Sequence, residues 1–169
     1  MRDAKIDTLY EGTTAIQGLD FFFRKIVRDN GATLMQLGME IKNFCESGGA
    51  LAEEKGKLLK ALGDFQGIVT VLVGHAMASQ AKPEEIYKVG LNTTRCLFAA
   101  GDVIIGWLLL RQAEIASAKL AENASDDFYI GKVAAAKHFV NVVLPHLTAE
   151  RKIAEATDGS IMELPEKAF

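Results

Sequence analysis

The sequence predicts an all-α protein, namely an up-down four-helix bundle preceded by a shorter helix-loop-helix segment. The 169 residues include only three prolines, and apolar residues recur at steps of three and four over long stretches, as on the buried face of a helix. No stretch of the sequence alternates polar and apolar residues for long enough to argue for a sheet. With 49% hydrophobic and 24% charged residues, the chain can bury one sizeable core.

The first thirty residues predict two helices with a joint between them. Residues 2–9 have the pattern of the last turns of one helix. Residues 13–28 have the pattern of a second helix, for which Thr13 or Gly12 is the expected N-cap. Asn30-Gly31 is a stop signal for that helix.

Four longer periodic segments follow and supply the expected bundle. The first ends at the sequence Ser47-Gly48-Gly49, and the second has a regular apolar seam. The apolar positions of these two segments are Leu34, Leu37, Ile41 and Phe44, and then Leu58, Leu62, Phe65, Val69, Leu72 and Ala76. Steps of four and three along the second segment are typical of a helix packed in a bundle.

The third and fourth segments have clear start signals. The turn at residues 82–85 places a proline and two acids where a helix begins. The stripe of the third segment is Ile86, Val89, Thr93, Cys96, Ala100, Val103, Trp107 and Leu110. If the third helix runs unbroken over residues 84–122, it is about 58 Å long at about 1.5 Å per residue. Ser125-Asp126-Asp127 is the expected cap of the fourth helix, whose stripe is Val133, Lys137, Val140, Leu144 and Leu147, and Pro145 is expected to kink it.

Charge and cysteine usage exclude several classes of protein. A net charge of −3 and a pI near 5.6 give no broad positive field, so we expect no nucleic-acid partner. Cys45 and Cys96 lie in apolar helical patterns without CxxC spacing, which predicts reduced, buried thiols in a cytosolic protein. The N-terminus has no apolar signal-peptide core. The apolar run over residues 96–110 is short for a membrane span and contains Asp102, so we interpret it as a buried helix and expect a cytoplasmic protein without a transmembrane segment.

Other polar residues have structural interpretations that compete with functional ones. His146 and Glu150 have a spacing that suits a metal, but the sequence contains no Glu-x-x-His, and we expect no metal site. Asp102 is expected to pair with an Arg, Lys or His of a neighbouring helix, because burying an unpaired carboxylate is costly. Glycines at 67, 74, 90, 101 and 106 are expected at close helix contacts, since no GxGxxG or P-loop is present.

The segment RDAKIDTLYEGTTAIQ, residues 2–17, resembles a motif near the C-terminus of flavin-dependent acyl-CoA dehydrogenases. That motif reads approximately Arg-Asp-Ala-Lys-Ile-x-x-Ile-Tyr-Glu-Gly-Thr-x-x-Ile-Gln. The resemblance implies that residues 1–30 are the end of the family's C-terminal helical domain. Residues 31–169 resemble, more weakly, the four-helix extension that follows the motif in larger members. The resemblance also implies that the cofactor FAD is held mainly by upstream domains.

The resemblance assigns roles to five residues. Glu11 is the implied catalytic base, which takes a proton from the carbon α to the thioester while a hydride leaves the β carbon for the flavin. A carboxylate at the end of an apolar tunnel is desolvated and becomes a stronger base. Gly12 leaves room for the substrate, Thr13 falls where the motif contacts FAD, and Thr14 is expected to assist. Arg24 lies one position from a basic substrate-binding residue of some relatives.

Two hypotheses follow. In the first, the chain is the C-terminal fragment of a FAD-dependent acyl-CoA dehydrogenase of fatty acid oxidation. It carries the base but is inactive alone, and the complete enzyme is a dimer that passes electrons to a partner. Since Met1 stands partway through an expected helix, we expect a truncated piece or a split gene. In the second, the chain is a non-catalytic helical oligomerisation or interaction module.

The first thirty residues are also expected to present an apolar surface. Ile6, Leu9, Ile16 and Phe21 to Phe23 should form an apolar face that normally meets the missing domains, and for the three phenylalanines we favour packing over acyl contact. Such a face predicts self-association or a docked N-terminal helix in the isolated chain.

Overall fold

The computed structural model describes residues 13–168, and no strand occurs among them. The expected helix over residues 2–9, together with Glu11 and Gly12, lies outside the described residues. The elements are α2 (Thr14–Asp20), the π-helix η2 (Phe21–Val27), α3 (Ala32–Glu46), α4 (Ala52–Ala78), α5 (Glu85–Glu122), α6 (Asp127–Val142), α7 (His146–Glu155), and the short 3-10 helices η3 (Ser160–Met162) and η4 (Glu166–Ala168).

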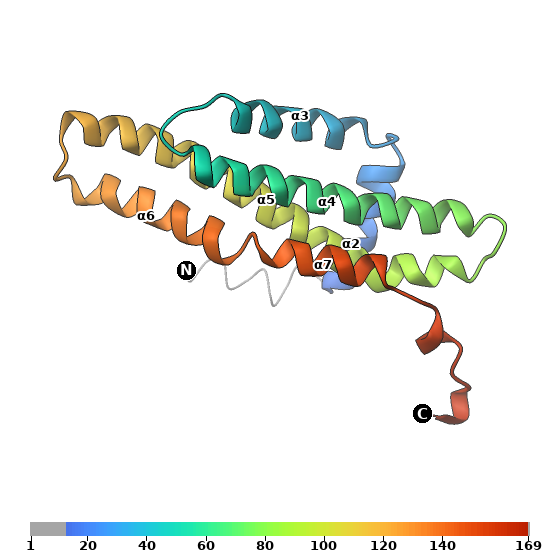
Figure 1. The fold of residues 1–169 in the computed structure, drawn as a ribbon. Helices are drawn as coiled ribbons and strands as arrows, with labels where there is room; N and C mark the ends of the chain where they lie inside the picture. The colour runs from blue at the N-terminus through green and yellow to red at the C-terminus, as the bar shows by residue number, and fades with distance from the viewer. Residues whose placement is uncertain (1–12, 169) are drawn as a thin grey trace.

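The predicted up-down bundle is confirmed. Figure 1 shows α3, α4, α5 and the pair α6 and α7 running back and forth along one long axis, with short connections between them. α5 spans 38 residues, as the sequence predicted, and it packs against α2, α4 and α6. The pair α6 and α7, which forms the fourth arm of the bundle, differs from the expectation of one kinked helix. It is interrupted before Pro145, which has no N–H to continue the helical hydrogen bonds, and α7 starts at His146.

Local sequence signals account for most helix ends. The side chain of Thr13 accepts a hydrogen bond from the Ile16 amide at the start of α2. The side chain of Asp126 likewise accepts a hydrogen bond from the Phe128 amide at the start of α6. Asn30 and Gly31 have φ values of 55° and 74°, in the left-handed region that ends helices. These predicted boundaries are confirmed.

The π-helix η2 was not predicted from the sequence. The Gly31 amide donates to the Ile26 carbonyl over 2.8 Å, and the Arg28 amide donates to the Phe23 carbonyl over 3.2 Å. Both bonds span five residues instead of four, which widens the last turns of the second predicted helix. Apolar periodicity alone does not distinguish such a turn from an α-helical one.

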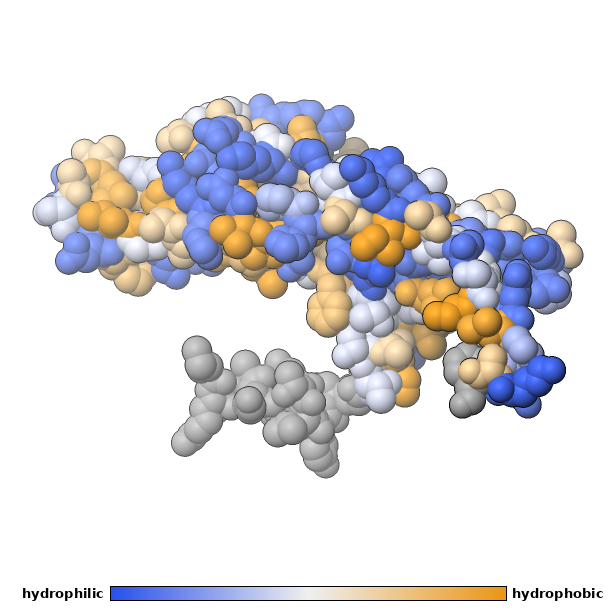
Figure 2. All heavy atoms as spheres, turned by 60° about the horizontal axis from the view of Figure 1, so that its bottom comes forward, coloured by the Kyte–Doolittle hydropathy of each residue, from blue (hydrophilic) through white to orange (hydrophobic). Residues whose placement is uncertain are grey.

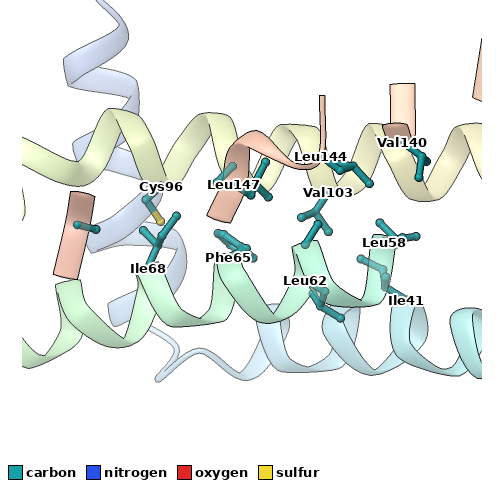
Figure 3. Packing of buried hydrophobic residues seen from close by; sticks show 14 of the residues in the cluster. Ile41, Leu58, Leu62, Phe65, Ile68, Cys96, Val103, Val140, Leu144 and Leu147 are labelled. Atoms are coloured by element: carbon teal, nitrogen blue, oxygen red, sulfur yellow. The ribbon is translucent and has the colours of Figure 1, made fainter. Parts of the chain in front are cut away.

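The core is formed by the predicted apolar stripes of α4 and α5. Figure 3 shows Cys96 of α5 facing Ile68 of α4, and Ile41, Leu58 and Leu62 grouped where α3 lies against α4. Val140, Leu144 and Leu147 close the core from the fourth arm. Ile86, at the start of the α5 stripe, is exposed, so the stripe is buried from Val89 onward, except for the partly buried Trp107.

By length and composition alone, α4 and α5 could each cross a membrane. The run over residues 96–110 belongs to a 38-residue helix, so the expectation that it is too short to span a bilayer was wrong. In the bundle, 33% of the most apolar stretch of α4 and 39% of that of α5 are buried. On the face drawn in Figure 2, hydrophilic and hydrophobic surface is intermixed. Packing in the core therefore accounts for part of the apolar composition of both helices.

The glycines expected at helix contacts divide into two groups. A Cβ at Gly106 would lie 3.2 Å from Leu144, and one at Gly67 would meet the guanidinium of Arg151. At positions 74, 90 and 101 a Cβ would have nothing within 4 Å. The prediction is therefore wrong for these three glycines, which face open space.

A buried lysine joins three parts of the bundle. Lys55 of α4 has no exposed side-chain surface, and its ammonium group forms an ion pair with Glu114 of α5. It also donates to the Ser47 hydroxyl over 3.0 Å and to the Gly48 carbonyl, and it lies 4.4 Å from the centre of the Phe44 ring. One cation thereby connects the end of α3 and the loop that follows it to the centre of the bundle.

We expect Lys55→Met to lower the free energy of unfolding by about 2 to 3 kcal/mol, because the three oxygen partners lose a charged donor in a buried place. Urea denaturation measures this change. Lys42→Met is the matched control. Lys42 pairs with the exposed Glu46 one turn away, an interaction worth about 0.5 kcal/mol. Equal losses in the two variants would contradict the role assigned to Lys55.

Candidate functional site

The residues singled out from the sequence lie at the start of the described chain. We call α2 and η2, with the cap residue Thr13, the N-terminal arm (residues 13–27). Thr13 and Thr14 are exposed at its beginning. The Thr13 oxygen accepts the bond from the Ile16 amide, and its hydroxyl hydrogen remains a donor. Glu11 and Gly12 directly precede the arm.

These threonines fit a supporting role toward a flavin. Both side chains are exposed, so neither lies in a cavity that could enclose an isoalloxazine ring. Each can donate one hydrogen bond to a group that is held elsewhere. The described residues of the arm are therefore compatible with contacting FAD but do not form a pocket for it.

Arg24 lies further along the arm and has a local partner. Its guanidinium pairs with Asp20 over 2.9 Å, one helical turn earlier, and its side chain is 65% exposed. An exposed ion pair of this kind contributes little to stability. The guanidinium is therefore accessible to an anionic ligand.

The two faces of the arm have different surroundings. Phe22 and Ile26 are buried in the core, which confirms packing for the central phenylalanine. Phe23 lies edge-on to Phe22 with 5.0 Å between ring centres. Ile16 is 61% exposed, and Leu19 and Phe23 are also exposed. The expected exposed apolar face is confirmed at Ile16 and Phe23 but is wrong for Phe22, which is buried, and Phe21 is only partly exposed. Ile6 and Leu9 lie outside the described residues.

Gly18 brings the arm into direct contact with the backbone of α5. A Cβ at this position would lie 2.9 Å from the carbonyl carbon of Thr93 and 2.9 Å from the amide nitrogen of Thr94. These are main-chain atoms of a long helix, so they cannot rotate away as the end of a side chain can. The close approach therefore needs glycine, a requirement that the sequence analysis did not identify.

A polar hollow of about 280 Å³ lies between α5 and α7. It contains Asp102, His146, Arg95 and Glu150. Burial raises the pKa of Asp102, and the charge of the nearby His146 opposes this effect. Arg95 forms an ion pair with Glu150 and donates to the side-chain oxygen of Asn92 over 3.1 Å. Within the hollow, Arg95 and Glu150 are thus paired, while Asp102 lies near His146.

Metal and thiol chemistry find little support in the described residues. Between residues 13 and 168, no three His, Cys, Asp or Glu side chains are grouped to hold a metal ion. Both cysteines are free, and burial raises the pKa of Cys45 to about 11 and of Cys96 to about 12. The thiolate is the nucleophilic form, so both thiols are unreactive near neutral pH. The expectation of a free, buried thiol is confirmed for Cys96, whereas Cys45 is free but only partly buried.

Comparisons with known proteins agree with one another. Residues 37–165 match the family model described as acetyl-CoA dehydrogenase C-terminal like. Over its whole length the chain is 52% identical to a broad-specificity linear acyl-CoA dehydrogenase of Mycobacterium tuberculosis, covering 29% of that protein. It is 34% identical to a butyryl-CoA dehydrogenase of Syntrophomonas wolfei, with 99% of the chain and 28% of the relative aligned.

A further relative is a 3-methylmercaptopropionyl-CoA dehydrogenase of Ruegeria pomeroyi, 30% identical over 95% of the chain and 27% of that protein. The chain therefore spans between a quarter and a third of the length of these curated relatives.

We expect Gly18→Ala to destabilise the packing of the arm on α5, because the added methyl group meets main-chain atoms that cannot yield. The free energy of unfolding in urea should fall by about 1 to 3 kcal/mol. Gly74→Ala is the control, since a Cβ there has open space and alanine favours a helix by about 1 kcal/mol. Unchanged or increased stability of Gly18→Ala would show that the two backbones are not in close contact.

Proposed function

Because the chain belongs to the acyl-CoA dehydrogenase family and matches its C-terminal part, we propose that it carries the catalytic base of a FAD-dependent enzyme. The proposed substrate is an acyl-CoA thioester, which is dehydrogenated between its α and β carbons in fatty acid oxidation. The observation that carries the proposal is the run Tyr10-Glu11-Gly12-Thr13, which leads directly into the arm packed on α5.

Each residue of this run has a chemical role in the proposal. The Glu11 carboxylate takes the proton from the α carbon, and its basicity increases when the bound acyl chain excludes water. The Glu11 amide donates to the thioester oxygen as charge develops there. Gly12 leaves space for the substrate. Thr13 and Thr14 contact FAD, which supplies the hydride acceptor when bound, and Arg24 offers an exposed cation to the substrate.

The arm provides the fixed geometry that a general base needs. Proton transfer is efficient only when the base is held within reach of the reacting carbon. Thr13 caps α2, and Gly18 places α2 against the main chain of α5. Thr13, which follows Glu11 and Gly12 in the sequence, therefore caps a helix whose position is set by the bundle. The flavin and the thioester must be held by other parts of the polypeptide, so we propose that this chain alone is inactive.

We propose a division of the chain at residue 30. Residues 1–30 belong with the catalytic part and residues 31–169 form the helical extension. The left-handed turn at Asn30 and Gly31 supports this boundary. Because the arm packs on α5, the two parts share an interface.

One observation favours the alternative of a helical interaction module. Leu91, Phe98 and Ile105 of α5 are all exposed and stand seven residues apart. Residues with this spacing lie on one face of a helix. We infer that this face is covered by a second copy of the chain, in line with the dimer proposed for the complete enzyme.

We expect Glu11→Gln in the complete enzyme to reduce kcat by about a hundredfold to ten-thousandfold, because the substitution removes the base and keeps its shape. Steady-state acyl-CoA oxidation with an artificial electron acceptor measures the loss, and the spectral change of FAD on adding acyl-CoA reports binding. Glu122→Gln, at the exposed end of α5, is the control and should keep full activity. Unchanged turnover of Glu11→Gln would leave the bundle as a scaffold only.

We expect the isolated chain to form dimers through the Leu91, Phe98 and Ile105 face, since exposed apolar side chains in a row favour association. Sedimentation over a range of concentrations should show a monomer-dimer equilibrium. Phe98→Ser should shift it to monomer, whereas Phe128→Ser, at an exposed site on α6, should not. A strict monomer at all concentrations would contradict this assembly.

A further inference from the structure

An elongated apolar hollow lies between η2 and α3 on one side and α4 and α5 on the other. Its volume is about 690 Å³, within the range of roughly 300 to 1,000 Å³ of small-molecule sites. Along α4 its lining extends from Leu62 to Met77, a rise of about 22 Å at 1.5 Å per residue. Protein interiors contain few voids larger than a water molecule, so a hollow of this size is a candidate binding site.

The lining of the hollow selects an apolar occupant. None of the residues that line it carries a charge, and the polar side chains among them are Asn30, Gln66 and Thr70. The Thr70 hydroxyl already donates to the main-chain carbonyl of Gln66 over 2.8 Å. An ordered water needs two to four polar partners. Water is therefore poorly held along most of the hollow, and an apolar molecule gains by replacing it.

The shape of the hollow selects a slender occupant. Its floor includes Ile26, Ile41 and Val103, which are only 3%, 1% and 2% exposed, while Met35 and Met77 at its edge are 62% and 67% exposed. The hollow is thus open at its edge and reaches down to buried core residues. An extended peptide would bury main-chain groups that the aliphatic lining cannot pair.

We propose that this hollow binds one linear alkyl chain, such as the tail of a fatty acid or of an acyl thioester. A flexible hydrocarbon chain is slender, has no polar group along its length and can adapt its conformation to the side chains of the lining. The two methionines at the opening have adaptable thioether side chains that can close over it. Since no charged residue lines the hollow, recognition depends on the length of the chain and not on its head group. This proposal goes beyond the proposed reaction and requires neither Glu11 nor flavin.

Fluorescence of cis-parinaric acid, a linear polyene fatty acid that brightens in apolar surroundings, tests the proposal on the 169-residue chain. We expect saturable binding. Dodecanoate and dodecyltrimethylammonium, below their micellar concentrations, should displace the probe with similar affinity despite their opposite charges. Each methylene removed from the chain should weaken displacement about fourfold. Dodecanoyl-CoA should compete no better than dodecanoate if the alkyl chain alone is recognised.

Variants that fill the hollow locate the bound probe. Val69→Phe and Val73→Phe add volume at two half-buried lining positions on α4, and each should weaken probe binding at least tenfold. Val142→Phe makes the same change at an exposed position of α6 and should leave binding unchanged. Urea denaturation of each variant verifies that it is folded.

Four outcomes would overturn the proposal. They are no saturable binding, binding unaffected by a folded filling variant, displacement that requires the CoA head group or one sign of charge, and loss of probe binding as the chain dimerises. The last outcome would assign the hollow to a second copy of the chain. Because the readout is binding to the isolated chain, failure here is independent of whether Glu11 acts as a base.

Discussion

The contact of Gly18 with the main chain of α5 is the constraint on which the proposed site depends. A helix approaches another helix this closely only where a side chain is missing. The contact fixes where α2 lies on α5, and thus where its cap residue Thr13 lies. α5 is in turn packed against α4 and α6, so the arm is supported by the largest buried part of the molecule. The bundle therefore positions Thr13, which follows Glu11 and Gly12 in the sequence.

Polar groups within the bundle determine how its apolar helices align. Lys55 holds the loop after α3 against α5 through Glu114. Asp64 plays a similar part for the fourth arm, where it accepts a hydrogen bond of 2.6 Å from Thr148 of α7 and pairs with Lys60 over 2.9 Å. Burial acts to raise the pKa of Asp64, but its hydrogen bonds and the nearby cations outweigh burial and hold the pKa below its usual value. α7 is therefore held on α4 after the interruption at Pro145.

The sequence predicted the features that depend on local patterns. Apolar periodicity identified the stripes of α4 and α5, and cap chemistry identified Thr13 and Asp126. Features that depend on which surfaces meet were missed. Five glycines were assigned to helix contacts, but three face open space, while Gly18 was not singled out because its partner lies 75 residues away in the sequence. The π-helix and the interruption between α6 and α7 change hydrogen bonding without changing the apolar pattern. The site residues Glu11 and Gly12 lie outside the described residues, so their roles stay predictions based on the motif.

Hydrogen exchange of the arm amides in the isolated chain tests the central claim most directly, because exchange reports whether α2 and η2 remain packed on α5. If the arm is packed on α5, amides of residues 18–28 exchange at least about a hundredfold more slowly than in an unfolded peptide, together with those of α5. Exchange of the arm at unfolded-peptide rates, while α4 and α5 stay protected, would contradict this packing. The bundle would then fold without holding the segment that carries Glu11 in place.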